Sequence, residues 1–395
     1  MKGKANNKRE MNLVKTGEKV LKVVKPDFIV NSQRAVEYIN SLTSDHKTLS
    51  RKRVRELEIQ PQPAQRTEEW YKARETRITA SEAACCVSKT KEICEEYVKL
   101  YSIKDFKMGD TVSANKYKTQ DKFLIEKATS FYDRKSGIIK PYMSSDATRW
   151  GQKFEDSALR MYTLITGESV KEFGLICHKS LNWLGASPDG ITDTGIMLEI
   201  KCPKSREITG VPPLHYYIQC QIQLECCDLE MCHFVECEME EHTEEEWLKS
   251  DREHYGIIIE YQEGKREDVS ESEDVFMDDA GIVGPFKEIN WGERDPTESK
   301  YKYPPIKQMT KQELQDWLLV IRNSELEGIQ HEPVYYTIKT YNIDSIKRSR
   351  EWFETAKPIL KSVHDKLEWL QQDEENLKRY KREISKEEIY EDCIL

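Results

Sequence analysis

The sequence predicts an α/β protein, on the evidence of two kinds of periodicity. Residues 196–201 alternate in the manner of a strand, whereas apolar side chains in 154–165 and 352–370 recur at helical spacing. A chain of 395 residues has enough core for one large domain with insertions or for two domains. Its mean hydropathy is -0.74, and no apolar run in the sequence approaches the length of a membrane span.

The alternating run 196–201 places two charged side chains on one face of its strand. Leu198 and Ile200 point to one side, and Glu199 and Lys201 point to the other. The α-carbons of Glu199 and Lys201 are then roughly 7 Å apart. The sequence therefore predicts a carboxylate and an ammonium group next to each other on a strand.

A turn before this strand adds a second carboxylate. Residues 181–186 read as the antiparallel neighbour of 196–201, and Pro188-Asp189-Gly190 with 193–195 supply the turn residues between them. Asp189 would then lie at the mouth of the hairpin, near Glu199.

Phosphodiester hydrolysis is one chemistry that uses this set. Carboxylates of Asp189 and Glu199, with the Ile200 carbonyl, are hard oxygen ligands for a cation that polarises a phosphate. Lys201 could orient or deprotonate the attacking water, since nearby cations lower the pKa of a lysine. The alternative is a solvated strand face in a chain that is 33% charged.

The helix at 154–165 brings a third carboxylate into consideration. Phe154, Ala158 and Ile165 follow one stripe, Gly167 ends it, and Glu155 borders it, within reach of a metal site. Glu155 could equally be an exposed first-turn glutamate that the helix dipole favours.

Polar side chains that could contact DNA flank these acids. Gln219, Gln221 and Gln223 lie in an apolar helical segment, where Gln219 and Gln223 share a face and could bind phosphate or sugar oxygens. Arg74 and Ser81 are suited to a terminal phosphate. Each of these residues could also be ordinary helix surface.

The order of these segments resembles a known family. Five short motifs follow one another along the chain: Q-x-x-x-x-W-x-x-x-R-x-x-x-I-T-A-S at 65–81, W-G-x-x-x-E at 150–155, S-P-D-G at 187–190, L-E-I-K-C-P at 198–203 and Y-x-x-Q-x-Q at 216–221. This order is similar to that of the lambda exonuclease and YqaJ-type viral recombinase family of PD-(D/E)-x-K nucleases. The resemblance covers about 65–90 and 149–237 and continues weakly at 334–370, in the branch found in large DNA viruses.

The resemblance implies a restriction-endonuclease-like core, with a central mixed β-sheet flanked by helices and interrupted by insertions. The implied activity is 5'-to-3' exonuclease action on linear double-stranded DNA with two Mg²⁺ ions, for which Mn²⁺ may substitute, leaving 3' single strands for recombination, repair or viral genome processing. The implied catalytic and metal residues are Asp189, Glu199, Lys201 and Glu155, with Ile200 as a further ligand, and the implied 5'-phosphate and DNA contacts are Arg74, Ser81, Ser187, Gln219 and Gln221.

The implied partners are double-stranded DNA ends, a single-strand annealing protein and, as a homotrimer, two further copies of the chain. One departure is Lys179-Ser180, where the phage enzyme has another acidic residue. A second is the insertion at about 90–148, which either lengthens a DNA channel or pads the surface.

Charge and composition suggest the division of the chain. We expect a basic extension at 1–60, a core at 61–237 plus 334–371, an acidic insertion at 238–333 and a charged helix or tail at 372–395. Residues 1–60 hold 14 Lys and Arg against 7 Asp and Glu, whereas 238–298 hold 6 against 21. An acidic segment repels phosphates, so 238–298 should face away from DNA.

Smaller features within these regions also carry expectations. We expect a short helix at 244–248, a strand at 255–261 and a flexible loop at 263–280. Residues 50–55 form a basic cluster that is either a nuclear localisation signal or a patch that is solvated or contacts phosphates. Pro358 should bend or restart the C-terminal helix.

Eleven cysteines do not form the pattern of a disulfide framework, which favours a reducing compartment. A group at 220–237 (Cys220, Cys226, Cys227, Cys232, His233 and Cys237) suggests either a zinc or iron-sulfur site or small apolar core residues. We expect a soluble intracellular protein of the nucleus or cytoplasm with no membrane association.

Two other functions stay open. The first is a structure-specific or restriction-type endonuclease with the same fold. The second is a DNA-binding module without catalysis, although such a module gains nothing from unpaired carboxylates beside phosphates.

Overall fold

A computed structural model describes residues 15–16, 19–20, 29–30, 32–104, 106, 119–138, 145–262 and 299–392. The chain divides into two compact units. Unit 1 comprises 1–141, 158–238 and 340–395, and unit 2 comprises 142–157 and 239–339. The loop predicted at 263–280 lies outside the described residues.

Unit 1 is built around a mixed β-sheet with the strand order β13-β10-β9-β8-β5, in which β3 also pairs with β13. β9 is parallel to β10 and antiparallel to β8. The strands are β3 (Ile29–Val30), β5 (Val170–Lys171), β8 (Gly190–Thr192) and β9 (Ile196–Lys201), with the unit 1 parts of β10 (Met231–His242) and β13 (His331–Lys347). The predicted α/β class, with a mixed sheet flanked by helices, is confirmed.

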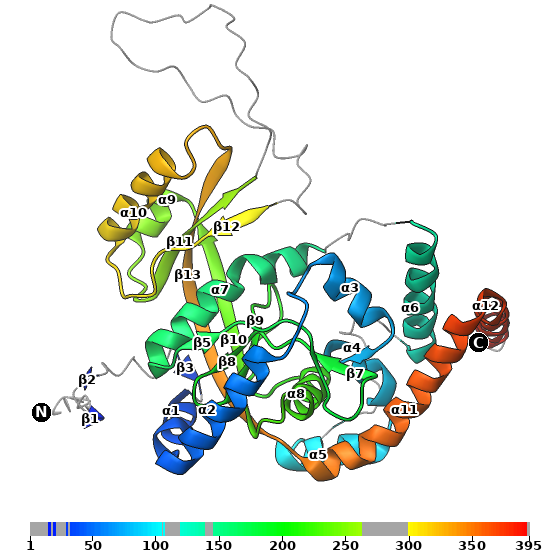
Figure 1. The fold of residues 1–395 in the computed structure, drawn as a ribbon. Coiled ribbons are helices and arrows are strands. Elements are labelled where there is room, and N and C mark those ends of the chain that lie inside the picture. The colour runs from blue at the N-terminus through cyan, green and yellow to red at the C-terminus, as the bar shows by residue number, and fades with distance from the viewer. Residues whose placement is uncertain are drawn as a thin grey trace, which may run out of the picture. The chain divides into compact units, whose positions relative to one another are not determined.

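Helices surround this sheet. They are α1 (Ser32–Ser41), α2 (Ser44–Ile59), α3 (Glu68–Glu75), α4 (Ala80–Val87), α5 (Lys91–Leu100), α6 (Gln120–Lys135), α8 (Leu214–Cys227), α11 (Arg350–Gln372), α12 (Glu374–Asp392) and the end of α7 (Asp146–Thr166). A small sheet contains β4 (Ile78–Thr79), β7 (Leu184–Ala186) and β6 (Ile176–Cys177), and β1 (Lys15–Thr16) pairs with β2 (Lys19–Val20). Figure 1 shows α11, in orange, running past α4, α5 and α6.

The hairpin that carries Asp189 differs from the prediction. The partner of β9 is β8, with Ile191 opposite Met197, whereas the predicted partner at 181–186 lies in the small sheet as β7. The turn at 187–189 moves the chain from one sheet to the other, so a strand of three residues suffices beside β9. Gly190 is required here, because a Cβ atom would lie 2.4 Å from Val170 Cγ1 on β5.

Part of the predicted basic extension folds into two helices. Residues 32–59 form α1 and α2, and Val54 and Leu57 of α2 are buried in the main core. The basic cluster at 50–55 lies on α2, where Arg53 Nε donates to the Cys227 carbonyl at 2.9 Å. Two apolar contacts per helix are too few for a clear periodic signal, yet they suffice to dock it.

The C-terminal helix α11 has the apolar stripe that the sequence predicted. Trp352, Leu360 and Leu367 on this stripe are buried, and Ser349 caps its first turn by accepting from Trp352 N–H at 3.2 Å. The expected restart at Pro358 is wrong, because the helix continues through this residue.

Unit 2 contains a sheet with the order β12-β11-β13, in which β11 (Tyr255–Tyr261) is antiparallel to both neighbours. β12 spans Lys300–Lys302, α9 spans Glu244–Lys249 and α10 spans Lys311–Ser324. The core of this unit contains Trp247, Ile257, Ile259, Leu314, Leu318, Leu326 and Tyr335. The predicted helix at 244–248 and strand at 255–261 are confirmed.

Among the described residues, no helix combines the length and the apolar character needed to cross a bilayer.

Candidate active site

Asp189 is held beside β9 by two hydrogen bonds. Its N–H donates to the Leu198 carbonyl at 3.2 Å, and its Oδ2 accepts from the Ile200 N–H at 2.6 Å. Gln65 steadies the preceding turn by donating to the Pro188 carbonyl at 3.0 Å. The predicted proximity of Asp189 to the charged face of β9 is therefore found, although a different strand produces it.

Glu199 is the most enclosed acid of the site, with a residue exposure of 1%. Gln219 Nε2 and Gln223 Nε2 each donate to its carboxylate at 2.7 Å, and Lys201 Nζ is bonded to the same group. A buried carboxylate needs such donors to offset the loss of water. The three donors fix both oxygens of Glu199 in space.

Lys201 is held in its charged form by its neighbours. Burial alone would lower the pKa of this ammonium group, but the carboxylates of Glu199 and Asp189 outweigh that effect and raise the pKa well above its ordinary value. Its Nζ also lies 5.2 Å from the centre of the Tyr216 ring. The expected fall in the pKa of Lys201 requires added cations, because the protein's own charges act in the opposite direction.

The donor set suits a hard divalent cation. Asp189, in the turn before β8, and Glu199, on β9, supply carboxylate oxygens, and Ile200 follows Glu199 on β9 and donates its N–H to Asp189. Two carboxylates face one ammonium group, so the site has a charge deficit that a cation would fill. Mg²⁺ and Mn²⁺ both prefer ligands of this kind.

Glu155 lies on the part of α7 that belongs to unit 2, and its side chain is half-buried. Asp189, Glu199 and Lys201 belong to unit 1. A metal-binding role for Glu155 therefore stays a prediction.

A second group of predicted residues meets around Trp70. Arg74 on α3 donates from Nη2 to Ser81 Oγ on α4 at 3.2 Å, and its guanidinium lies 4.2 Å from the centre of the Trp70 ring. The Trp70 indole N–H donates to Ser187 Oγ at 2.9 Å. Arg74 and Ser81 lie on two helices, α3 and α4, which β4 connects.

Gln223 connects this group to Glu199. Its Nε2 donates to Glu199 Oε2 at 2.7 Å and lies 3.4 Å from the Ser187 carbonyl oxygen. The sequence placed Gln223 on the same helical face as Gln219, but the DNA contacts implied by the family resemblance did not include it. A spacing of four residues puts both glutamines on one helical face, and it is the sequence signal that places Gln223 in the candidate site with Gln219.

Gln221 lies elsewhere. Its Nε2 donates to the Lys347 carbonyl at 2.8 Å, and its Oε1 accepts from the Ser349 N–H at 2.8 Å, so the amide joins α8 to the start of α11. The side chain is almost fully buried. The predicted DNA contact does not fit this position, because successive residues of a helix point about 100° apart and Gln221 is turned away from Gln219.

The chain was then compared with known proteins. Residues 69–230 match the family described as the YqaJ-like viral recombinase domain. The chain is therefore similar to this family over residues 69–230, the matched region. The matched region contains every predicted site residue, from Arg74 to Gln221.

A curated relative is the uncharacterized protein R354 of Acanthamoeba polyphaga mimivirus, which is 25% identical over 276 residues. The aligned region covers 64% of this chain and 49% of the mimivirus protein, so the chain spans about half the length of that relative.

Two solved structures were also found. One is LHK-Exo in complex with dAMP, at 19% identity and a TM-score of 0.39, and the other is an alkaline exonuclease (LHK-Exo) from Laribacter hongkongensis, at 17% identity and a TM-score of 0.37. Each match covers 81% of this chain and 99% of the solved chain. Scores this low do not establish a common fold by themselves.

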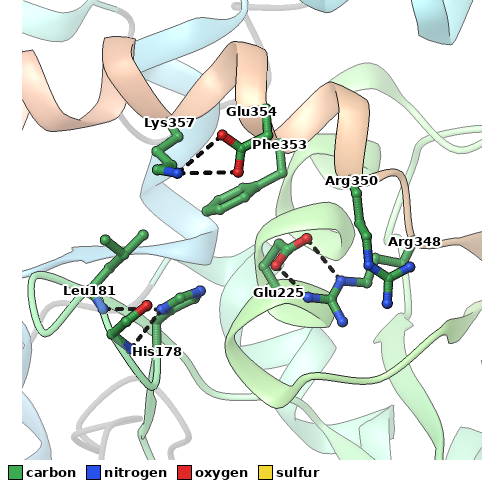
Figure 2. A pocket seen from close by; sticks show the side chains of 9 residues that line it. His178, Leu181, Glu225, Arg348, Arg350, Phe353, Glu354 and Lys357 are labelled. Carbon is green, nitrogen blue, oxygen red and sulfur yellow. Dashed lines mark hydrogen bonds and ion pairs between the residues drawn. The ribbon is translucent and has the colours of Figure 1, made fainter.

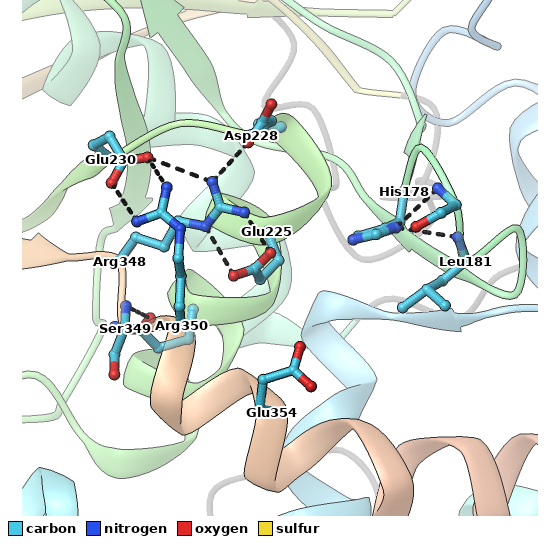
Figure 3. Close-up of polar contacts among 12 residues, drawn as sticks. His178, Leu181, Glu225, Asp228, Glu230, Arg348, Ser349, Arg350 and Glu354 are labelled. Atoms are coloured by element: carbon cyan, nitrogen blue, oxygen red, sulfur yellow. Dashed lines mark hydrogen bonds and ion pairs between the residues drawn. The ribbon is translucent and has the colours of Figure 1, made fainter.

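A pocket of about 250 Å³ lies where the matched region meets α11 (Figure 2). It is lined by His178, Ser180, Leu181, Glu225, Arg348, Arg350, Phe353, Glu354 and Lys357. Its cations are paired: Arg348 with Glu225 at 2.5 Å and Arg350 with Glu230 at 2.5 Å (Figure 3), and Lys357 with Glu354 at 3.1 Å (Figure 2). These cations are therefore neutralised by carboxylates of the same chain, and we assign the pocket no ligand.

The described cysteines of the matched region and its surroundings are free thiols. Cys220, Cys226, Cys227, Cys232 and Cys237 are all buried, as small apolar residues would be. Among the described residues, no three side chains of the predicted cysteine group and His233 have ligand atoms within 4.8 Å of one another.

Proposed function

We propose that this protein is a metal-dependent exonuclease that digests linear double-stranded DNA from its 5' ends. The match to a viral recombinase domain supports a role in recombination, for which a 3' single strand is the useful product. Direction, substrate and metal dependence are part of the proposal.

One observation carries the proposal. A path of direct contacts runs from Lys201 and Glu199 through Gln223, Ser187 and Trp70 to Arg74 and Ser81. At one end are carboxylates and an ammonium group, which suit phosphodiester cleavage. At the other end are a guanidinium and a hydroxyl group, which suit a terminal phosphate. Cleavage next to a bound end is what an exonuclease requires.

We assign the cutting half to Asp189, Glu199 and Lys201. Bound divalent cations, held by the Asp189 and Glu199 carboxylates, would supply Lewis-acid polarisation of the phosphate and a more acidic water. The Lys201 ammonium group would orient the attacking water and offset the negative charge that develops on the phosphorane. Gln219 and Gln223 would hold the Glu199 carboxylate still during this step.

We assign the binding half to Arg74, Ser81 and Ser187. The guanidinium of Arg74 would pair with the 5' phosphate, and the two hydroxyl groups would donate to its oxygens. Each cleavage leaves a new 5' phosphate, which is the group that this half would bind next. Repeated cleavage without release follows from that chemistry.

Digestion of three DNAs with Mg²⁺ tests the proposal: a linear duplex with 5' phosphates, the same duplex with 5' hydroxyl groups, and a closed circle. We expect mononucleotide release that is fastest from the phosphorylated ends, no cutting of the circle, and no activity in Lys201→Met. Nicking of the circle would favour a structure-specific or restriction-type endonuclease. Duplex binding without any product would favour a non-catalytic module. The annealing partner and the homotrimer stay predictions.

A further inference from the structure

We infer that Lys127 and Glu82 are positioning residues for the 5'-phosphate group, and that helix α6 of the segment 90–148 thereby belongs to the end-recognition apparatus. This inference rests on the proposed function and extends it to residues outside the predicted site. It also assigns a role to a segment that the sequence left undecided between a DNA channel and surface.

Glu82 is buried beneath Arg74 and Ser81. Its residue exposure is 7%, and its Oε2 accepts from Lys127 Nζ at 2.6 Å, Thr79 Oγ1 at 2.7 Å and the Thr79 N–H at 3.0 Å. The bonds to Thr79 form the capping box of α4, the helix that carries Ser81. Lys127 reaches this point from α6, forty-five residues further along the chain, and is 6% exposed.

The same carboxylate also faces Arg74. Its second oxygen, Oε1, lies 3.8 Å from Arg74 Nη2, the nitrogen that donates to Ser81 Oγ. Trp70 packs against the guanidinium at 4.2 Å. Arg74 is thus held on one side by an aromatic ring and on another by Glu82, which fixes the direction of its donors.

The charges explain why a lysine is needed. Arg74 and Glu82 alone would form a neutral pair, and a neutral pair attracts a phosphate weakly. Lys127 satisfies the other oxygen of Glu82, so the three side chains carry a net charge of +1. Burial raises the pKa of the Glu82 carboxyl, but Lys127 and Arg74 outweigh that effect and lower it, so the carboxylate stays ionised. Burial also lowers the pKa of the Lys127 ammonium group, which Glu82 opposes.

Stability alone does not account for the pair. Replacing a buried ion pair by apolar side chains of similar size is often neutral or stabilising. The capping box of α4 needs only Thr79 and Glu82, without Lys127. A lysine buried against this carboxylate is better explained by the excess positive charge that it leaves at Arg74.

The test compares Lys127→Met, Lys127→Arg, Glu82→Gln and the double variant Lys127→Met/Glu82→Gln with the full-length protein. Lys122→Met is the matched control, because Lys122 lies on the same helix, is 53% exposed and pairs only loosely with Glu126 at 3.9 Å. Two ratios are measured for 5'-phosphorylated against 5'-hydroxyl duplexes: the affinity without divalent cations, by fluorescence anisotropy, and the digestion rate with Mg²⁺.

We expect the affinity ratio to fall about tenfold in Lys127→Met and Glu82→Gln, to recover in Lys127→Arg, and to stay unchanged in Lys122→Met. The double variant removes both buried charges and should fold like the unmodified chain. It keeps a net charge of +1 through Arg74 but lacks the carboxylate that orients the guanidinium, so the ratio should stay low. A folded double variant with an unchanged phosphate preference overturns the inference, as does an unmodified protein with no such preference. Absence of digestion with an intact affinity ratio would overturn the proposed nuclease and leave the inference standing.

Discussion

The indole N–H of Trp70 donates to the hydroxyl group of Ser187 at 2.9 Å. Trp70 lies on α3 beside Arg74, and Ser187 lies two residues before Asp189. This bond therefore joins the group proposed to bind a DNA end to the turn that carries a proposed metal ligand. A displacement of Arg74 would reach Ser187 through the contact of its guanidinium with the Trp70 ring and the hydrogen bond from Trp70 to Ser187.

Trp70→Phe should separate the ring contact from the hydrogen bond. Phenylalanine keeps an aromatic face for Arg74 but cannot donate to Ser187, and a lost hydrogen bond of this kind changes a free energy by about 1 kcal/mol. We expect kcat/KM for 5'-phosphorylated duplex to fall about fivefold. Trp70→Ala, which also removes the ring, should lose more. Equal activity of the two variants would show that the hydrogen bond alone matters.

Lys201→Met should abolish digestion while the chain stays folded. Loss of a group that transfers or orients a proton lowers rates by about 10² to 10⁴. Lys204→Met, three residues away on an exposed position, is the control and should stay active. Near-normal digestion by a folded Lys201→Met protein, measured by nucleotide release and a thermal melt, would refute the assignment.

Gln219→Leu and Gln221→Leu should have opposite effects, although the residues are two apart. Gln221 joins α8 to the start of α11, so its loss leaves buried backbone groups unpaired and should destabilise the fold by about 1–3 kcal/mol. Gln219 contacts Glu199, so its loss should lower the rate instead. Urea unfolding and digestion rates measured on both variants check this. Loss of activity in folded Gln221→Leu would restore the predicted DNA contact.

The stability of unit 1 should fall in mild acid because of His233. Its ring is buried, Nδ1 is hydrogen-bonded to the Tyr162 hydroxyl at 2.8 Å, and burial lowers its pKa from 6.5 to about 3. The unfolded chain therefore takes up a proton first as the pH falls below about 6.5, and stability declines from there towards pH 3.

For His233 alone, the loss at pH 5 is about 2 kcal/mol. His233→Gln removes the titration, so its melting temperature should change less between pH 8 and pH 5 than that of the unmodified protein. An identical pH dependence in the two proteins, followed by circular dichroism, would contradict the role of His233.

The pocket beside α11 offers a matched pair of arginines. Arg348 has a side-chain exposure of 8% and pairs with Glu225, which is itself buried, whereas Arg350 is 62% exposed. Arg348→Met leaves a buried carboxylate unpaired and should destabilise the protein by about 3 kcal/mol. Arg350→Met should change stability by less than about 1 kcal/mol. Similar melting temperatures for both variants would show that Glu225 finds another partner.

The sequence predicted the parts of the site that depend on local periodicity. Alternation along β9 correctly placed Glu199 and Lys201 on one face, and the spacing of four residues correctly placed Gln219 and Gln223 on one face of α8. Both predictions need only the geometry of a single element.

Contacts between distant segments were not predictable in this way. The partner of β9 was misassigned because a turn at 187–189 leads from one sheet to the other, and no local pattern distinguishes that from a hairpin. The pairing of Lys127 with Glu82 joins two helices across a segment of weak pattern. A lysine in an exposed-looking helix carries no sign in sequence that it will be buried.

The positions of the cysteines make their reactivity a measure of unfolding. The ten described cysteines all lie in unit 1, and every one except Cys177 is buried. Burial also raises the pKa of thiols such as Cys226 and Cys237, which suppresses the reactive thiolate. The rate of alkylation at these positions, located by peptide mass spectrometry, would report the unfolding of unit 1 without an engineered label. Unfolding of unit 2 would not change the alkylation of the described cysteines.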